Sequence, residues 1–167
     1  MIAPATTSID HLALPRRLAR TVPPVLAGAV VGGLGTRPGS PWYRALRKPS
    51  WQPPAAVFGP VWTALYAAAA GAGASMLERV PVDDRHDVER ALWLNMGLNA
   101  GWCWLFFTAE KPRWALAEIV LLQASTLDLV RRARAAGDDR AALALAPYVG
   151  WNAFATALNV AIVRRNP

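Results

Sequence analysis

The stretch AALALAPYVGWNAFATALNVAIV, residues 141–163, contains no charged side chain. A helix needs roughly 20 apolar residues to cross a bilayer core of about 30 Å, and this stretch is long enough. Helices of water-soluble bundles are polar on one face, and here no charged residue marks such a face. A transmembrane helix is therefore favoured over the alternative, a soluble helical bundle.

Four more stretches are nearly free of charge: residues 21–36, 49–77, 91–109 and 114–130, the last interrupted only by Glu118 and Asp128. The chain of 167 residues is 54% hydrophobic and 17% charged, which is too apolar for an ordinary soluble domain. We therefore predict an all-α fold, a membrane-embedded bundle of five transmembrane helices. The connections are short, so residues 16–167 should form a single domain after a flexible tail of residues 1–15.

The segment WYRALRKPSWQPP, residues 42–54, mixes two Trp and one Tyr with two Arg and one Lys. Indole and phenol rings settle at the level of lipid headgroups, and Arg and Lys reach the water beside them. We expect this segment to be a loop in the membrane interface. Other basic residues also cluster in loops, so the net charge of +7 points to anionic lipids of the bilayer rather than to nucleic acid.

The N-terminal segment has two interpretations, because Arg16, Arg17 and Arg20 before the apolar residues 22–34 could belong to a signal peptide. No small-x-small cleavage pattern follows, so we expect a retained first helix. Frequent Ala and Arg without an organelle-targeting sequence favour a multi-pass protein of a bacterial cytoplasmic membrane.

Few residues in the sequence could bind a metal. His11 and His86 fall in the tail and in a loop, and Cys103 is the single cysteine. Protein metal sites need several such ligands together, so we predict none. Cys103 is expected to act as a small buried hydrophobic residue.

The stretch 91–109 has two distinct faces. At 100° per residue, Asn95, Asn99, Trp102 and Phe106 fall on one stripe. Amides within a membrane normally face protein or a cavity, so this stripe should face inward.

Two pairs of glycines, Gly28 with Gly32 and Gly97 with Gly101, would form notches on their helices. Such notches let another helix approach closely. Packing within the chain and contact with a second copy of the chain both stay open.

Aromatic residues recur at helical spacing in two other stretches. They are Tyr148, Trp151, Ala155 and Leu158 in the last stretch, and Trp62 and Tyr66 in the second. A cavity with these walls would suit a flat, largely apolar ligand. The alternative is a packed core of aromatic rings.

A longer pattern joins these residues. It reads W-Y-x-x-L-x-K-P-x-W-x-P-P at Trp42, Tyr43, Leu46, Lys48, Pro49, Trp51, Pro53 and Pro54, and continues with Gly59, Pro60, Val61, Trp62, Leu65 and Tyr66. Further matches are Asn99, Trp102, Phe106, Phe107, Trp114, Ala115, Leu116, Pro147, Tyr148, Trp151, Phe154, Ala155, Leu158 and Asn159. The pattern resembles the signature of the translocator protein family, also called tryptophan-rich sensory proteins or peripheral-type benzodiazepine receptors. The likeness covers nearly everything after residue 20.

The resemblance implies a five-helix membrane bundle, often a homodimer, with a pocket under the first loop. It implies a receptor or carrier for tetrapyrroles such as protoporphyrin IX and haem, which would be ligands rather than required cofactors. The pocket would include Tyr43, Trp62, Tyr66, Asn99, Trp102, Trp151 and Ala155. We add Phe106 and Leu158 from the two stripes, and Trp51 from the loop.

The resemblance also implies an alternative function, because some bacterial members are reported to degrade porphyrin in light. The two Trp residues implicated there match Trp62 and Trp151. Whether the chain is an enzyme stays open. Some members bind sterols, but the proposed sterol pattern is broken here, since residues 160–164 after Leu158 and Asn159 contain no Tyr, and sterol binding is not expected.

Overall fold

The computed structural model describes residues 12–167, and it is all-helical over this range, which confirms the predicted all-α class. Six α-helices are present: α1 (Leu14–Gly35), α2 (Pro41–Ala45), α3 (Ala55–Arg79), α4 (Arg85–Cys103), α5 (Pro112–Ala135) and α6 (Asp139–Arg165). A short 3-10 helix, Val82–Asp84, precedes α4, and a π-helical turn, Trp104–Thr108, extends it. Of the expected tail, residues 1–11, which include His11, lie outside the described residues, and α1 already begins at Leu14.

Three helices, α1, α3 and α6, are long and apolar enough to cross a membrane. α4 is not apolar enough over its length, because its first turns carry Arg85, Asp87, Glu89 and Arg90. α5 also falls short, since acidic and basic residues interrupt its sequence. The structure therefore supports three candidate spans, and the count of five transmembrane helices stays a prediction.

Local sequence explains where several helices begin. Ser40 caps α2 by accepting a hydrogen bond from the Tyr43 backbone N–H at 3.1 Å, and Pro41 occupies the first turn, where no backbone donor is needed. Pro112 likewise occupies the first turn of α5. Gly137, at φ 68°, reverses the chain after α5, and the Asp138 carboxylate caps α6. A loop was predicted for residues 42–54, and the structure shows that this segment begins with the short helix α2.

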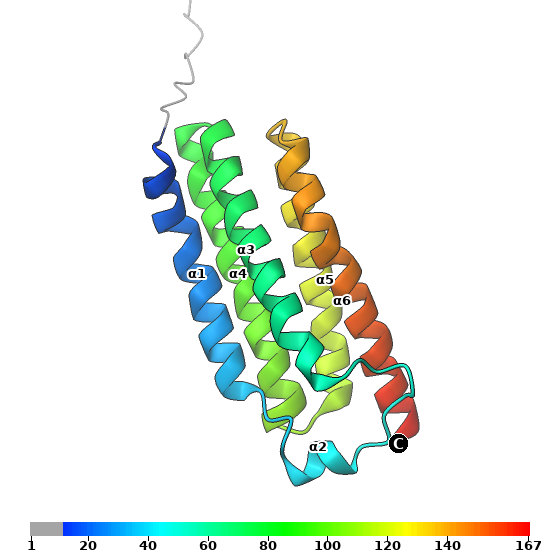
Figure 1. The fold of residues 1–167 in the computed structure, drawn as a ribbon. Helices are drawn as coiled ribbons and strands as arrows, with labels where there is room; N and C mark the ends of the chain where they lie inside the picture. The colour runs from blue at the N-terminus through cyan, green and yellow to red at the C-terminus, as the bar shows by residue number, and fades with distance from the viewer. Residues whose placement is uncertain (1–11) are drawn as a thin grey trace, which may run out of the picture.

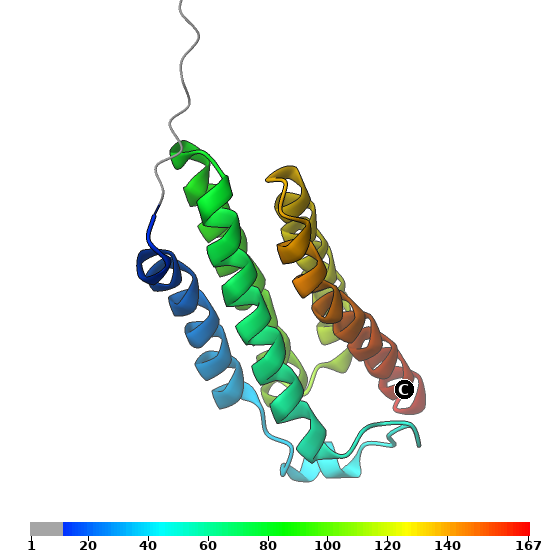
Figure 2. The same cartoon turned by 45° about the horizontal axis from the view of Figure 1, so that its top comes forward.

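The five long helices run along one another, and α2 lies across one end of the bundle (Figure 1). α5 and α6 pair on one side, while α1, α3 and α4 group on the other, as the turned view also shows (Figure 2). The buried core does not follow this side-by-side grouping: it forms two clusters, one after the other along the bundle axis, and each contains residues from both groups of helices. One cluster includes Val25, Ala69 and Leu92, and a second, nearer α2, is built around Phe106 and Leu158.

The end remote from α2, around Thr21, Gly73, Leu92 and Asp138, is called the closed end. A Cβ atom on Gly73 would lie 2.6 Å from Leu92 Cδ1 and 3.1 Å from Thr21 Cγ2, so α1, α3 and α4 meet here with no spare room. Ion pairs join the helix ends as well. Arg79 of α3 lies 3.2 Å from the Asp138 carboxylate.

The structure distinguishes the two glycine notches. A Cβ atom on Gly28 would lie 2.8 Å from Met96 Cβ, and one on Gly32 would lie 3.4 Å from Ala100 Cα, so this notch packs α1 against α4. A Cβ on Gly97 would meet nothing within 4 Å. The Gly28 notch therefore serves packing within the chain, while Gly97 lies open on the outer face of α4.

Candidate functional site

A cavity of about 490 Å³ lies between the helices near α2. We call this half of the bundle the cavity end. Its walls come from every long helix and from the loop that carries α2. The described lining residues are Ala29, Gly32, Gly33, Thr36, Pro38, Tyr43, Ala55, Phe58, Gly59, Trp62, Tyr66, Asn99, Trp102, Cys103, Phe106, Phe107, Ile119, Leu122, Trp151, Asn152, Ala155, Leu158, Asn159 and Ile162. Its volume falls within the usual range for sites that bind small molecules.

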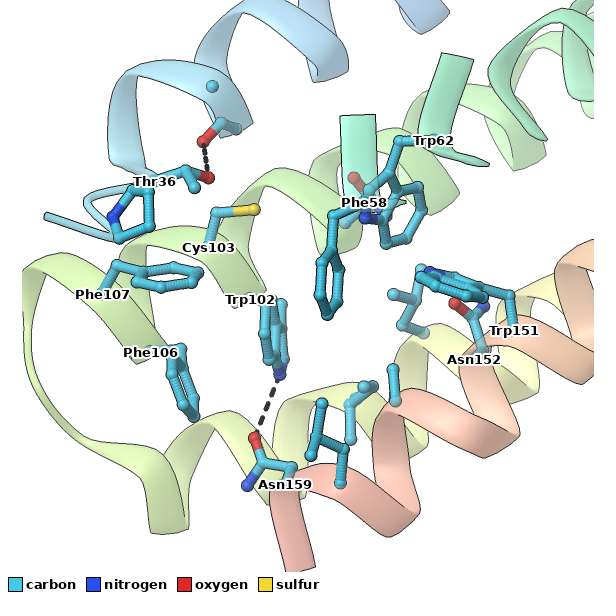
Figure 3. Close-up of a pocket in the computed structure, with 18 of the residues that line it drawn as sticks. Thr36, Phe58, Trp62, Trp102, Cys103, Phe106, Phe107, Trp151, Asn152 and Asn159 are labelled. Carbon is cyan, nitrogen blue, oxygen red and sulfur yellow. Dashed lines mark hydrogen bonds between the residues drawn. The ribbon is translucent and has the colours of Figure 1, made fainter. Parts of the chain in front are cut away.

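Two groups of aromatic rings face this cavity from opposite sides (Figure 3). In one group, Trp62 and Trp151 meet edge to face, with ring centroids 6.4 Å apart, and Phe58 lies 5.7 Å from Trp151. In the other, Trp102 stacks on Phe106 at 4.9 Å and 17°. The cavity thus offers apolar ring faces and edges to a flat guest.

The loop with α2 closes the end of the cavity. Tyr43 packs against Phe107 at 5.0 Å, and its hydroxyl oxygen accepts a hydrogen bond from Gln52 at 3.2 Å. Burial raises the pKa of Tyr43, and the bond from Gln52 opposes that rise only in part. Arg165, at the end of α6, donates to the Lys48 carbonyl at 3.1 Å, so this bond ties the loop after α2 to the end of α6.

A chain of hydrogen bonds runs from the cavity into the core. Tyr66 donates to Asn99 Oδ1 at 2.6 Å, and Asn99 Nδ2 donates to the Tyr148 hydroxyl at 3.4 Å. Tyr148 donates to Asn95 Oδ1 at 3.0 Å. Oδ1 and Nδ2 of Asn99 therefore each have a protein partner. Asn99 nevertheless lines the cavity, where it is predicted to anchor a ligand.

A second amide, Asn159, sets the position of an aromatic wall. Trp102 Nε1 donates to Asn159 Oδ1 at 3.3 Å, and Asn159 Nδ2 donates to the Pro112 carbonyl at 2.8 Å. Asn159 is only 1% exposed. It thereby links α4, α5 and α6 and fixes the indole that faces the cavity.

The cavity brings together nine of the ten residues predicted to bind ligand, from five elements of the fold. They are Tyr43, Trp62, Tyr66, Asn99, Trp102, Phe106, Trp151, Ala155 and Leu158. Trp51 is not part of the lining; it packs against Phe154 at 5.7 Å and is 48% exposed. Ligand binding by these residues stays a prediction.

Sequence reasoning missed several lining residues. Phe58 precedes Trp62 by one helical turn, so helical spacing would have found it. Helical spacing places Asn152 and Asn159 on the face beside Trp151, but neither was predicted to bind ligand. Cys103, expected to be a small buried hydrophobic residue, is half-buried and lines the cavity.

The two acidic residues within α5 have different surroundings. Asp128 pairs with Arg131 at 2.6 Å and also with Arg132. Both oxygens of Glu118 are buried without a hydrogen-bond partner, and a Cβ atom on Gly101 of α4 would lie 4.0 Å from Glu118 Oε1. No group of three metal-binding side chains occurs within residues 12–167.

An all-helical chain with three candidate membrane spans and an aromatic cavity between its helices has the features of a helical membrane protein. Comparison with known families is more specific. The family model described as the TspO/MBR family matches residues 21–165. The chain belongs to this family, and it is a membrane protein.

Individual relatives agree with the family. Over 132 residues the chain is 37% identical to the tryptophan-rich protein TspO of Chlorobaculum tepidum, covering 78% of this chain and 83% of that protein. It is 36% identical over 128 residues to the translocator protein of Homo sapiens, with 75% of each chain covered. Protein CrtK of Rhodobacter capsulatus is 31% identical over 150 residues, covering 85% of this chain and 89% of that protein.

Proposed function

We propose that the protein is a membrane receptor or carrier that binds porphyrin-type ligands, protoporphyrin IX or haem, in the cavity. The observation that carries the proposal is the cavity of about 490 Å³ between two groups of aromatic rings. Burial of apolar ring surface and ring stacking would supply the affinity. The likeness to proteins named tryptophan-rich and translocator supports the same choice.

The proposal includes five membrane-crossing helices. α5, with 24 residues, is long enough for a bilayer core, and α4 reaches a similar length with its π-helical turn. Large apolar side chains on their outer faces are exposed, among them Leu94 at 60%, Leu121 at 59% and Leu127 at 48%. Lipid is the solvent in which such outward faces are stable, and we place the protein in a bacterial cytoplasmic membrane.

Protoporphyrin IX binding to the detergent-solubilised protein tests the proposal. We expect saturable quenching of tryptophan fluorescence, because Trp62, Trp102 and Trp151 line the cavity. Replacing Trp151 by Phe should weaken binding, while replacing Trp93, which is 50% exposed on the outside of α4, should not. Quenching that rises linearly without saturation, or that depends equally on both residues, would count against a specific pocket.

Light-dependent degradation of porphyrin is the alternative function. The edge-to-face pair of Trp62 and Trp151 in the cavity wall favours it, since an indole beside a bound photosensitiser is open to oxidation. Illuminating the protein with protoporphyrin IX in the presence of oxygen separates the two functions. Loss of porphyrin absorbance that disappears in Trp62→Phe or Trp151→Phe supports the alternative, and unchanged absorbance rules it out.

We further propose that the protein forms a homodimer through the open face of α4 at Gly97. A Cβ there meets no atom within 4 Å, so a second helix could approach closely. Gly97→Leu should then convert dimers into monomers in light scattering of the purified protein. A dimer that persists in this variant would show that another face is used.

A further inference from the structure

One buried polar atom at the cavity lacks a partner. Asn152, on α6, lines the cavity and is 0% exposed, and its Oδ1 accepts no hydrogen bond. A buried amide oxygen without a donor is costly, because it has lost its hydrogen bonds to water. Figure 3 shows this oxygen turned toward the cavity, next to the ring of Trp151.

The hydrogen-bond network fixes which amide atom faces the cavity. Asn152 Nδ2 donates to Thr126 Oγ1 at 3.0 Å. The hydroxyl has one hydrogen, and Thr126 donates it to the Leu122 carbonyl at 2.9 Å. Toward Asn152 it can therefore act only as an acceptor. Exchanging the two amide atoms would place two acceptors against each other as long as Thr126 donates to Leu122, so this network favours an oxygen that points away from Thr126.

Four other polar groups that line the cavity already have protein partners. Asn99 Nδ2, Asn159 Nδ2, Trp102 Nε1 and the Tyr66 hydroxyl all donate to protein acceptors. Asn152 Oδ1 differs from them because its partner must come from outside the network. An atom held rigidly by Thr126 and lacking a donor is preorganised to receive one.

We propose that Asn152 is a specificity-determining residue whose Oδ1 accepts a hydrogen bond from an N–H or O–H group on the edge of a flat apolar ligand. This inference rests on the proposed ligand-binding function of the cavity. The inner N–H groups of protoporphyrin IX point to the centre of its ring, and the propionates on its edge are ionised at neutral pH and can only accept, so this ligand leaves the Asn152 oxygen unpaired. Ring systems with a donor on their edge, of the pyrrole, indole or lactam type, therefore gain a contact that a porphyrin does not make.

Two probes that differ in one donor test the inference: carbazole, with an edge N–H, and N-methylcarbazole. Their affinities for the full-length protein in detergent would be measured by displacement of protoporphyrin IX. We expect the wild-type protein to prefer carbazole by about tenfold, because the methylated probe leaves the buried oxygen unsatisfied. Partition of the probes into detergent is common to all variants, so ratios are compared between variants.

Two variants should remove this preference by different routes. Asn152→Leu replaces the amide by an apolar group with the same branching. Thr126→Val leaves the cavity lining untouched, since Thr126 is 0% exposed and not a lining residue, but it frees the amide to turn. Asn159→Leu is the matched control: its amide is equally buried but fully paired, so the ratio of the two affinities should survive even where both affinities fall.

The outcomes separate the inference from the proposed function. If protoporphyrin IX binds and the wild-type protein does not distinguish the two probes, the specificity role of Asn152 is refuted and the receptor proposal stands. A preference that persists in both Asn152→Leu and Thr126→Val also refutes it. If neither protoporphyrin IX nor either probe binds saturably, the proposed function fails and the inference fails with it.

Discussion

The two ends of the bundle are built from residues of different size, and α3 contains both kinds. At the closed end α3 runs through AAAAGAGAS, residues 67–75, and a Cβ on Gly73 would be only 2.6 Å from Leu92. At the cavity end the same helix carries Phe58, Trp62 and Tyr66, and a cavity of about 490 Å³ remains beside it. One helix thus takes part in tight packing and in an open pocket.

The difference shows how a cavity can persist in a close-packed bundle. Small residues let helix backbones approach until no space is left. Aromatic rings that meet edge to face, such as Trp62 and Tyr148 at 6.0 Å, hold their backbones apart and fill the intervening volume incompletely. The stability of the protein should therefore depend on the closed end, and ligand affinity on the cavity end.

The largest expected effect comes from filling the closed space between α1 and α4. Gly28→Leu would place Cβ 2.8 Å from Met96 Cβ and 3.1 Å from the Met96 carbonyl oxygen, and a backbone atom cannot move aside cheaply. We expect a loss of about 3 kcal/mol, measured by thermal unfolding in detergent. Gly33→Leu in the same helix is the control, because a Cβ there meets nothing within 4 Å. Equal destabilisation by both would contradict the division into two ends.

The next largest effect concerns the Asp138 carboxylate, which joins α3 to α6. It accepts from the Ala141 N–H at 3.0 Å and from Ser75, and it pairs with Arg79 at 3.2 Å. Asp138→Asn should cost about 2 kcal/mol, because the charge is lost from a site that is 1% exposed. Ser40→Ala, at a cap of the cavity end, is the comparison and should cost about 1 kcal/mol or less.

The Asp138 carboxylate should also make the stability of the protein depend on pH at low pH. Burial raises the pKa of Asp138, but the bonds from Ser75 and Ala141 and the charge of Arg79 outweigh burial and lower it. A lowered pKa adds stability that is fully present above the unfolded value of about 3.9 and is lost as the pH falls through the folded pKa. Wild-type stability should therefore drop in this acid range more steeply than that of Asp138→Asn. Parallel pH profiles would exclude the carboxylate as the cause.

The sequence predicts the long helices better than it predicts their ends. Charge-free stretches locate α1, α3 and α6, because burial in lipid selects for uninterrupted apolar residues. The short helix α2 was expected as a loop, although Ser40 before Pro41 is a recognisable start signal. The early start of α1 at Leu14 was missed because Arg16 and Arg17 resemble a polar tail; Arg17 in fact pairs with Glu78 of α3.

The site was predictable where one helix carries its own pattern. The stripe with Asn99, Trp102 and Phe106 lines the cavity because one face of a helix points one way. Phe107 also lines it, and here the π-helical turn changes the angular spacing that the sequence reading assumed. The unpaired oxygen of Asn152 was beyond reach, because its orientation depends on Thr126 of a different helix.

A smaller effect is expected from the two carboxylates of α5, one in each half. Glu118, towards the cavity end, has two buried oxygens without a partner, so Glu118→Leu should raise stability by about 1 kcal/mol. Asp128, towards the closed end, pairs with Arg131 and Arg132, so Asp128→Leu should lower it by about 0.5 kcal/mol. Thermal unfolding of both variants gives the sign. A destabilised Glu118→Leu would mean that this carboxylate has a partner in the membrane-bound protein.

The smallest effect on stability should accompany a clear effect on binding. Gly59 of α3 lines the cavity, and a Cβ on it would meet no atom within 4 Å. Gly59→Leu should therefore leave stability unchanged or raise it by up to about 1 kcal/mol, since leucine favours the helix. Its side chain would occupy cavity volume and reduce protoporphyrin IX affinity roughly tenfold. Gly71→Leu offers the same helix preference and open space away from the lining, so its affinity should match the wild type. If Gly59→Leu binds porphyrin normally, the ligand does not occupy this part of the cavity.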